Sequence, residues 1–267
     1  MKYNTKIILG VIFSIFLIYL IFNLFSSTTN TSDIEIVVSR YAEDIEWIRN
    51  PPYNEYPYIV YNKGKTEEYA KTDKFVKEVK LPNVGRESHT YLYHIIENYD
   101  NLANLTIFLP GSVEVEHKQV RAKKLFDAIK KGDAKGSFMS CNMDNIPVLS
   151  YQKDFELDEY GQNVTNENNA KENMGISSST KLSDIRPYGE WYQAHFGDKN
   201  KDYNCFAANA IFAISKATIL DKPKSYYEEL IKEIDDHSNP ETGHYFERAW
   251  NTVFYPYVDG YTETKTQ

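Results

Sequence analysis

The sequence predicts one mixed α/β domain with a mainly parallel sheet, behind a single N-terminal transmembrane helix. Short β-branched runs alternate with segments of helical period, which is typical of α/β domains. One unbroken apolar run near the start has the length of a membrane-spanning helix. The 267 residues, 42% of them hydrophobic, suffice for a substantial core and are too apolar for a disordered chain. No internal repeat or second domain is evident.

The transmembrane prediction rests on residues 7–25, which read IILGVIFSIFLIYLIFNLF. At about 1.5 Å per residue they span roughly the 30 Å of a bilayer's hydrocarbon core. Lys2 and Lys6 precede the run, and no Lys or Arg follows before Arg40. The positive-inside rule therefore predicts a single-pass signal anchor in the lipid bilayer, with a cytoplasmic N-terminus. The alternative is a cleaved signal peptide, whose apolar region is usually shorter.

This topology defines the expected parts of the chain. Residues 1–6 form a cytoplasmic tail, 7–25 the anchor, 26–32 a stalk, 33–260 a lumenal or extracellular domain and 261–267 a frayed tail. In such a compartment three Asn-x-Ser/Thr sites are glycosylation acceptors: Asn30, Asn104 and Asn163. Cys141 and Cys205 either pair there or stay as two buried thiols, and the sequence leaves this open.

The expected elements follow from local patterns. Buried β-branched or alternating runs predict strands at 34–39, 58–61, 75–81, 105–109 and 137–141. Helical spacing of apolar residues predicts helices at 43–49, 85–99, 118–130, 225–236 and 244–254. Residues 151–185 are polar and have no clear period, which indicates a loop or an insertion. Aromatic and then apolar stretches at 188–196 and 205–215 return the chain to the domain.

Ligands of parallel sheets bind at the carboxyl ends of the strands, so the turns after Ser39, Tyr61 and Leu109 are the places to search. Phosphate-loop, dinucleotide-binding, zincin and nucleophile-elbow motifs are all missing from the sequence. The net charge of −8 argues against a nucleic-acid partner, because phosphate contacts need an excess of Lys and Arg.

The first two turns carry candidate binding residues. Arg40, Glu43 and Asp44 follow the first strand, where a cation and two carboxylates suit a ribose, a diphosphate or a metal. The alternative is that the two acids only open the next helix and complement its dipole. Asn62 and Lys63 stand in the turn after the second strand, which should open on the same sheet edge.

Two helices carry the remaining candidates. Arg86, Glu87 and His89 begin the helix at 85–99, at the end that favours anions, although a local salt bridge explains part of the cluster. Glu247 and Arg248 on the last helix form either a functional acid with its cation or a structural ion pair. The acid-x-acid pattern at residues 154–158 is the nearest approach to a clamp for Mn²⁺ or Mg²⁺, with a solvated acidic loop as the alternative.

Several blocks carry a family resemblance: IVVSRYAEDIEWI, the YNKG turn, LPNVGRESHTYLYHIIENYDNLANLTIFLPG, CFAANAIFAIS, YYEELI and GHYFERAW. They resemble the membrane-anchored domain-of-unknown-function family 3431 over most of residues 34–254. The family label gives no reaction. The order of elements also resembles, more distantly, sugar-nucleotide glycosyltransferases of the GT-A kind, which are Rossmann-like sandwiches.

The glycosyltransferase resemblance implies roles for the candidates. The donor nucleotide would lie beside Arg40, Glu43 and Asp44, Lys63 would offset diphosphate charge, and Glu247 would be the acid or base. The sequence departs from the pattern because no Asp-x-Asp follows strands 105–109 or 137–141. Any cofactor therefore stays open, with an Mn²⁺ or Mg²⁺ ion as the candidate.

Three functions remain as hypotheses. The first is a membrane-anchored glycosyltransferase that moves a sugar from a nucleotide donor to an unknown glycan acceptor, with Glu247 and His89 as catalytic residues. The second is a non-catalytic, membrane-anchored module that binds a glycan or a protein in the same cleft. The third is a hydrolase that uses His89 or His94 with Glu87, for which no nucleophile is recognisable.

Overall fold

The computed structural model describes residues 33–133, 136–141, 153–157, 180–199 and 207–265. The expected anchor at 7–25, the sequons at Asn30 and Asn163, the side chains of both cysteines and most of the segment 151–185 lie outside this description. Within it, no helix is long and apolar enough to cross a membrane.

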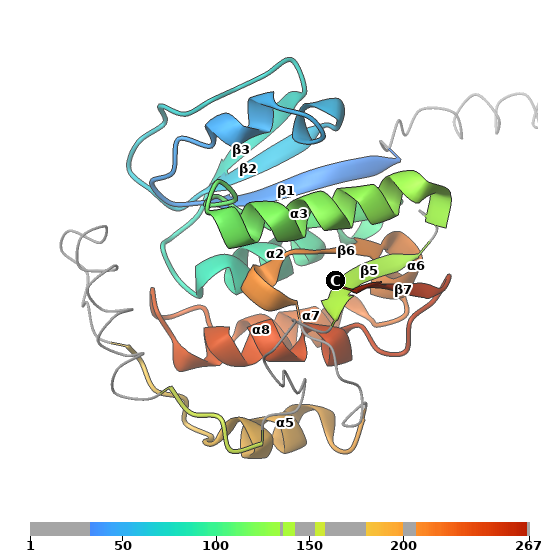
Figure 1. The fold of residues 1–267 in the computed structure, drawn as a ribbon. Coiled ribbons are helices and arrows are strands. Elements are labelled where there is room, and N and C mark those ends of the chain that lie inside the picture. The colour runs from blue at the N-terminus through green and yellow to red at the C-terminus, as the bar shows by residue number, and fades with distance from the viewer. Residues whose placement is uncertain (1–32, 134–135, 142–152, 158–179, 200–206, 266–267) are drawn as a thin grey trace, which may run out of the picture. The chain divides into compact units, whose positions relative to one another are not determined.

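A mixed, mostly parallel sheet of seven strands organises the described residues, in the order β3-β2-β1-β4-β6-β5-β7 (Figure 1). The strands are β1 (Ile34–Arg40), β2 (Tyr58–Asn62), β3 (Phe75–Lys80), β4 (Leu105–Pro110), β5 (Ser137–Cys141), β6 (Phe212–Ser215) and β7 (Tyr261–Lys265). Strand β1 runs parallel to β2 and β4, whereas β6 is antiparallel to both β4 and β5. The predicted α/β class is confirmed.

The chain changes direction across the sheet between β1 and β4. After β1 it adds β2 and β3 on one side, and it then returns to place β4 on the other side of β1. Such a topological switch point opens a crevice at the carboxyl ends of the two strands, because their connections leave in opposite directions. The turns after β1 and β4 therefore flank the expected ligand position.

Helices cover both faces of the sheet. They are α2 (Arg86–Glu97), α3 (Glu116–Ala128), α5 (Tyr188–Phe196), α6 (Lys216–Leu220), α7 (Lys224–Ile231) and α8 (Glu241–Val253). Short turns of helix complete the described elements: η1 (Glu46–Arg49), η2 (Tyr53–Glu55), η3 (Tyr99–Asn101), η4 (Ile129–Asp133) and η5 (Ala208–Ala210). Figure 1 shows α3 on one side of the sheet and α8 on the other, with α5 outermost.

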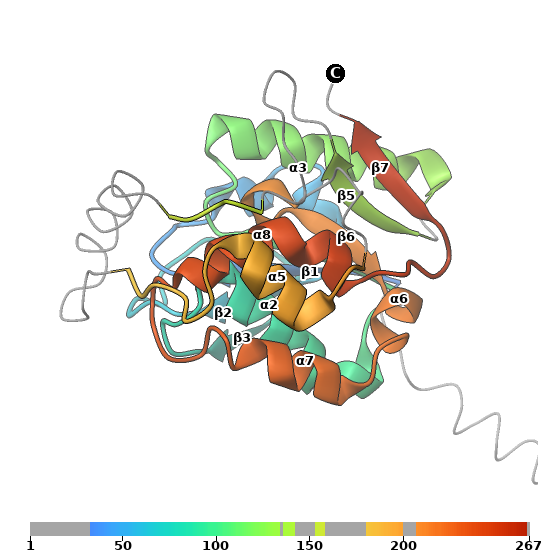
Figure 2. The same ribbon diagram turned by 90° about the horizontal axis from the view of Figure 1, so that it is seen from below.

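Strand alternation divides the core into two layers. Val37 and Phe108 pack with α2, α5, α7 and α8, while Val38 and Leu109 pack with α3, η1 and η2. Successive residues of a strand face opposite sides of the sheet. All four side chains are fully buried because helices cover both sides. Seen from below in Figure 2, α5 and α8 lie over the face that α3 does not cover.

The structure corrects several boundaries. The last helix begins at Glu241, three residues before the expected 244, and the helix expected at 225–236 ends at Ile231. Residues 261–267 were expected to fray, yet 261–265 form β7, which pairs in parallel with β5. Their polar composition hides the strand, because it is the backbone that pairs with the sheet edge.

Candidate functional site

A cavity of about 580 Å³ lies at the carboxyl ends of β1, β2 and β4, and we call it the switch-point cavity. Its lining includes Ser39 and Arg40 at the end of β1, and Pro110 and Gly111 at the end of β4. The beginnings of α2, α3 and α8 close it. Six of the candidates from the sequence line it: Arg40, Glu43, Lys63, Arg86, Glu87 and Glu247.

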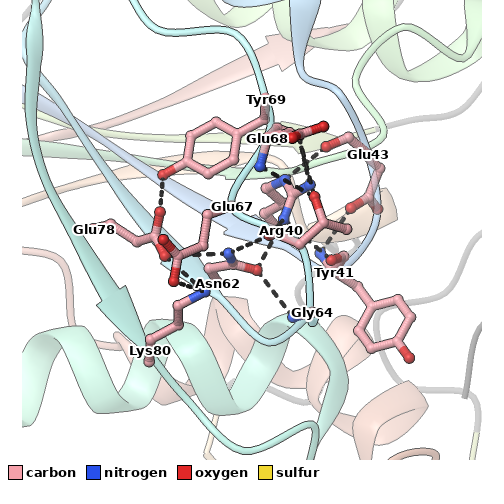
Figure 3. A network of polar contacts seen from close by, with 11 residues as sticks. Arg40, Tyr41, Glu43, Asn62, Gly64, Glu67, Glu68, Tyr69, Glu78 and Lys80 are labelled. Carbon is pink, nitrogen blue, oxygen red and sulfur yellow. Dashed lines mark hydrogen bonds and ion pairs between the residues drawn. The ribbon is translucent and has the colours of Figure 1, made fainter.

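The guanidinium of Arg40 is engaged by the protein. The residue is 1% exposed, and its Nε donates to the carbonyl oxygen of Glu43 at 2.6 Å. Its Nη1 donates to Asn62 Oδ1 and to the Thr66 carbonyl oxygen, both at 2.9 Å. Figure 3 shows the guanidinium enclosed by these turns, with Tyr69 beside it. Arg40 thus ties the turn after β1 to the segment after β2.

Asn62 takes part in the same network and does not line the cavity. Its Oδ1 also accepts a hydrogen bond from the backbone N–H of Gly64 at 2.9 Å (Figure 3). Gly64 has no room for a side chain, because a Cβ there would lie 1.6 Å from the carbonyl oxygen of Tyr41. The turns after β1 and β2 are therefore in direct contact, and only glycine fits at position 64.

The two acids after β1 have different surroundings. Glu43 lines the cavity, and its Oε2 accepts from the backbone N–H groups of Tyr41 at 2.7 Å and Ala42 at 3.1 Å. Asp44 is exposed and outside the lining, and its Oδ1 accepts from the N–H of Glu46 at 3.1 Å. Asp44 thus opens the short helix η1, as the alternative interpretation of these acids described.

The start of α2 brings charged groups together in the lining. Arg86 Nε lies 3.7 Å from Glu87 Oε2, and Arg86 Nη1 lies 3.3 Å from Asn239 Oδ1. Burial alone raises the pKa of Glu87, but Arg86, its own backbone N–H, Lys118 and Lys63 together bring that pKa below its ordinary value. The ionised form of Glu87 is therefore favoured, and the residue occupies the helix end that favours anions.

Glu247 has the opposite electrostatic environment. Burial and the nearby Glu87 carboxylate raise its pKa, while Arg248 and the backbone N–H of Asn209 oppose the shift. That N–H donates to Glu247 Oε1 at 2.5 Å, and the side chain of Asn209 accepts a hydrogen bond from Arg121 Nη1. Among the carboxylates of the lining, Glu87 thus has a lowered pKa and Glu247 a raised one, and carboxylates with pKa values shifted apart are typical of acid–base sites.

Arg248 lies outside the lining although it follows Glu247 directly. Its guanidinium carbon is 3.4 Å from the ring centroid of Phe155, and its Nη1 donates to the carbonyl oxygen of His244 at 3.0 Å. Successive residues of a helix point about 100° apart, and here the side chain of Arg248 is directed to Phe155 while Glu247 lines the cavity. His244, one turn before Arg248, lines the cavity instead.

Sequence reasoning missed several residues of the lining: Ser112, Glu114, Lys118, Asn209 and Ser238. Lys118, in the first turn of α3, donates from its Nζ to Ser112 Oγ in the turn after β4 at 2.6 Å and supplies a cation to the cavity. That turn was among the places to search, and following it as far as the first turn of α3 would have found Lys118. No local pattern indicates Asn209 or Ser238, which long-range packing places there.

The two histidines of α2 are buried outside the lining. His89 is 6% exposed, and burial together with Lys63 lowers its pKa to about 3. His94 contacts the hydroxyl of Tyr61 through Nδ1 at 2.9 Å, and its Nε2 lies 3.6 Å from Glu35 Oε1. His94 therefore belongs to a buried network at Glu35 and is not paired with Glu87.

Glu35 makes stability depend on pH. Burial raises its pKa from 4.5 to about 7, with Lys77 opposing the shift. Because the folded state binds this proton more tightly, its stabilising contribution is complete below pH about 4.5 and is lost as the pH rises through about 7. We expect the free energy of unfolding of Glu35→Gln to fall less between pH 5 and pH 8 than that of the wild type.

Urea unfolding at the two pH values measures this difference. Glu97→Gln is the matched control, because Glu97 is exposed on the same helix as His94 and should leave the wild-type pH dependence intact. An unchanged pH dependence in Glu35→Gln would contradict the assignment.

The described residues do not assemble a metal clamp. Among them, no group of three or more His, Cys, Asp or Glu side chains is placed to hold a metal ion. In the acidic segment, Asp154 pairs with Lys153 at 2.8 Å and Glu156 with Arg186 at 3.5 Å, while Asp158 lies outside the description. We therefore derive no step through Mn²⁺ or Mg²⁺.

The sequon at Asn104 lies at the start of β4, far along the strand from the cavity. Asn104 is exposed, and its Nδ2 donates to Asp33 Oδ1 at 3.1 Å. Its glycosylation stays a prediction.

Comparison with known proteins gives one match. Residues 36–265 match the family model described as "Protein of unknown function (DUF3431)". No curated protein and no solved structure matches the chain.

Proposed function

We propose that this chain, which belongs to the family of unknown function DUF3431, transfers a sugar from a nucleotide-sugar donor to an acceptor hydroxyl. We also propose that residues 7–25 anchor it in a membrane with the domain on the lumenal or extracellular side, as their uninterrupted apolar sequence suggests.

The observation that carries the proposal is the pairing of Glu247 with cations in one cavity at the switch point. Arg86 and Lys118 line the same space as Glu247, and the turns after β1 and β4 flank it. In open α/β sheets this crevice is the usual ligand position. A diphosphate needs cations, and an acceptor hydroxyl needs a base, so the cavity offers both groups that sugar transfer requires.

In the proposed reaction, the Glu247 carboxylate takes the proton of the acceptor hydroxyl as its oxygen bonds to the sugar carbon. The bond between that carbon and the donor phosphate breaks, and the nucleoside diphosphate leaves with the electron pair. Arg86 and Lys118 stabilise the charge that develops on it. The raised pKa of Glu247 favours this role, because a carboxylate is a stronger base when its pKa lies closer to the working pH.

Thermal unfolding of the purified full chain against a panel of nucleotide sugars tests the proposal, with and without Mn²⁺. A ligand at 100 times its dissociation constant adds about 2.7 kcal/mol to the unfolding free energy, which raises Tm by several degrees. We expect a shift with one nucleotide family, and a much smaller shift in Arg86→Gln. No shift across the panel would contradict the proposal.

A rise in Tm does not distinguish sugar transfer from binding alone, whereas consumption of the nucleotide-sugar donor does. Release of the nucleoside diphosphate in the presence of glycan acceptors supports transfer. Stabilisation without consumption would favour the second hypothesis, a binding module that uses the same cavity.

A further inference from the structure

We propose that Lys63 is a positioning residue, whose side chain fixes the backbone turn at the start of α2 and so holds Arg86 in the switch-point cavity. The identity of the ligand that Arg86 contacts, a diphosphate group, rests on the proposed function. The positioning role itself rests on the contacts of Lys63.

The backbone at the start of α2 is in an unfavourable conformation. Gly85 has φ of 60° and Arg86 has φ of 50°, so two successive residues are left-handed. A Cβ on Gly85 would lie 2.3 Å from the carbonyl oxygen of Ile234, which leaves room for glycine alone. Arg86 has a side chain, and non-glycine residues adopt this region only when their surroundings enforce it.

The side chain of Lys63 holds this left-handed backbone in place. Its Nζ donates to the carbonyl oxygen of Val84 at 2.6 Å and also to the carbonyl oxygen of Arg86. These two carbonyl groups stand on either side of Gly85, so one ammonium group joins both arms of the turn. Hydrogen bonds from a charged donor are stronger than neutral ones, and this pair is buried, with Lys63 8% exposed.

The side chain of Arg86 depends on this turn for its direction. Its own contacts are long: 3.7 Å to Glu87, 3.3 Å to Asn239 and 3.5 Å to His244. The side chain is 33% exposed and lines the cavity. Because the contacts of the guanidinium within the described part of the chain are all long, its position depends strongly on the direction in which the backbone of Arg86 sends the side chain.

The charged groups around Lys63 make the contact sensitive to pH. Burial lowers the pKa of Lys63 to about 7, with Arg86 adding to the shift and Glu87 opposing it. His89 also faces Lys63 and is neutral, since its pKa is lowered to about 3. As the pH rises through 7, the two hydrogen bonds lose their charged donor, and we expect the order of Arg86 to decrease.

Amide hydrogen exchange and ¹⁵Nε relaxation of Arg86, measured on the full chain, test the positioning role without any ligand. In Lys63→Gln we expect exchange at residues 85–89 to rise about tenfold or more and the order parameter of Arg86 Nε to fall. Lys74→Gln is the control, because Lys74 is exposed at the neighbouring strand. Wild-type exchange and order in Lys63→Gln would overturn the proposal.

A pH titration of the wild type covers the case in which Lys63→Gln does not fold. The order of Arg86 Nε should decline between pH 6 and pH 8.5, where Lys63 loses its proton. Constant order across this range would contradict the inference.

A double-mutant cycle with inorganic pyrophosphate then asks how Lys63 affects binding. We expect Lys63→Gln and Arg86→Gln each to weaken binding about tenfold, and the double variant to bind no more weakly than Arg86→Gln. Additive losses would show that Lys63 contacts the anion itself and would overturn the positioning role. A wild type that does not bind pyrophosphate would count against the proposed function, while the exchange experiment still decides the role of Lys63.

Discussion

We expect Glu247→Gln to lower the rate of the proposed sugar transfer by about 10²- to 10⁴-fold while the protein stays folded. Removal of a positioned general base typically costs this much, because the acceptor hydroxyl then loses its proton to water. The amide is nearly isosteric with the carboxyl group, and its oxygen can still accept the hydrogen bond that Asn209 N–H donates to Glu247 Oε1. Release of the nucleoside diphosphate from the donor that the panel selects measures the rate.

The folded state must be checked beside the rate. Burial disfavours the charged form of Glu247, so the glutamine variant should unfold at the wild-type temperature or slightly above it. Glu229→Gln is the control, since Glu229 is an exposed residue of α7 with a side chain 73% exposed. Wild-type turnover in Glu247→Gln would remove this residue from the mechanism.

We expect Arg40→Met to destabilise the fold by about 3 kcal/mol or more, because it leaves several buried acceptors without their donor. The guanidinium serves Glu43 O, Asn62 Oδ1 and Thr66 O, and methionine can replace none of these hydrogen bonds. For a domain of this size the loss corresponds to a fall in Tm of roughly 6–12 °C. Thermal unfolding of the full chain measures it.

A surface arginine provides the matched comparison. Arg49 pairs with Glu46 on η1, and both side chains are more than half exposed. Arg49→Met should change the unfolding free energy by no more than about 0.5 kcal/mol, as is usual for exposed pairs. If Arg40→Met were as stable as Arg49→Met, Arg40 would regain the ligand-binding role that the sequence suggested.

The sequence alone determined the class of fold and the edge of the sheet at which to search. The β-branched run of β1 and the helical spacing of α2 are local signals, because the contacts that produce them lie within a few residues. The rule that parallel strands bind ligands at their carboxyl ends then placed Glu43 and Lys63 beside the cavity that the structure contains.

The tertiary structure decided which of these side chains face the cavity. Arg40 ends β1 and lines the cavity, but its guanidinium is held by carbonyl groups of the protein, whereas Asp44 lies outside the lining and opens η1. Glu247 and Arg248 are neighbours, and helix rotation directs only one of them into the lining.

Asn209 and the strand β7 depended wholly on long-range contacts, whereas Lys118 lies within reach of the turn after β4. Lys118 follows β4 by a turn and enters the cavity because α3 begins there. Asn209 meets Glu247 from a different part of the chain, and β7 exists because β5 offers it an edge. Periodicity reports the interactions of a residue with its neighbours in sequence, whereas a binding site is made by residues that packing brings together from far apart.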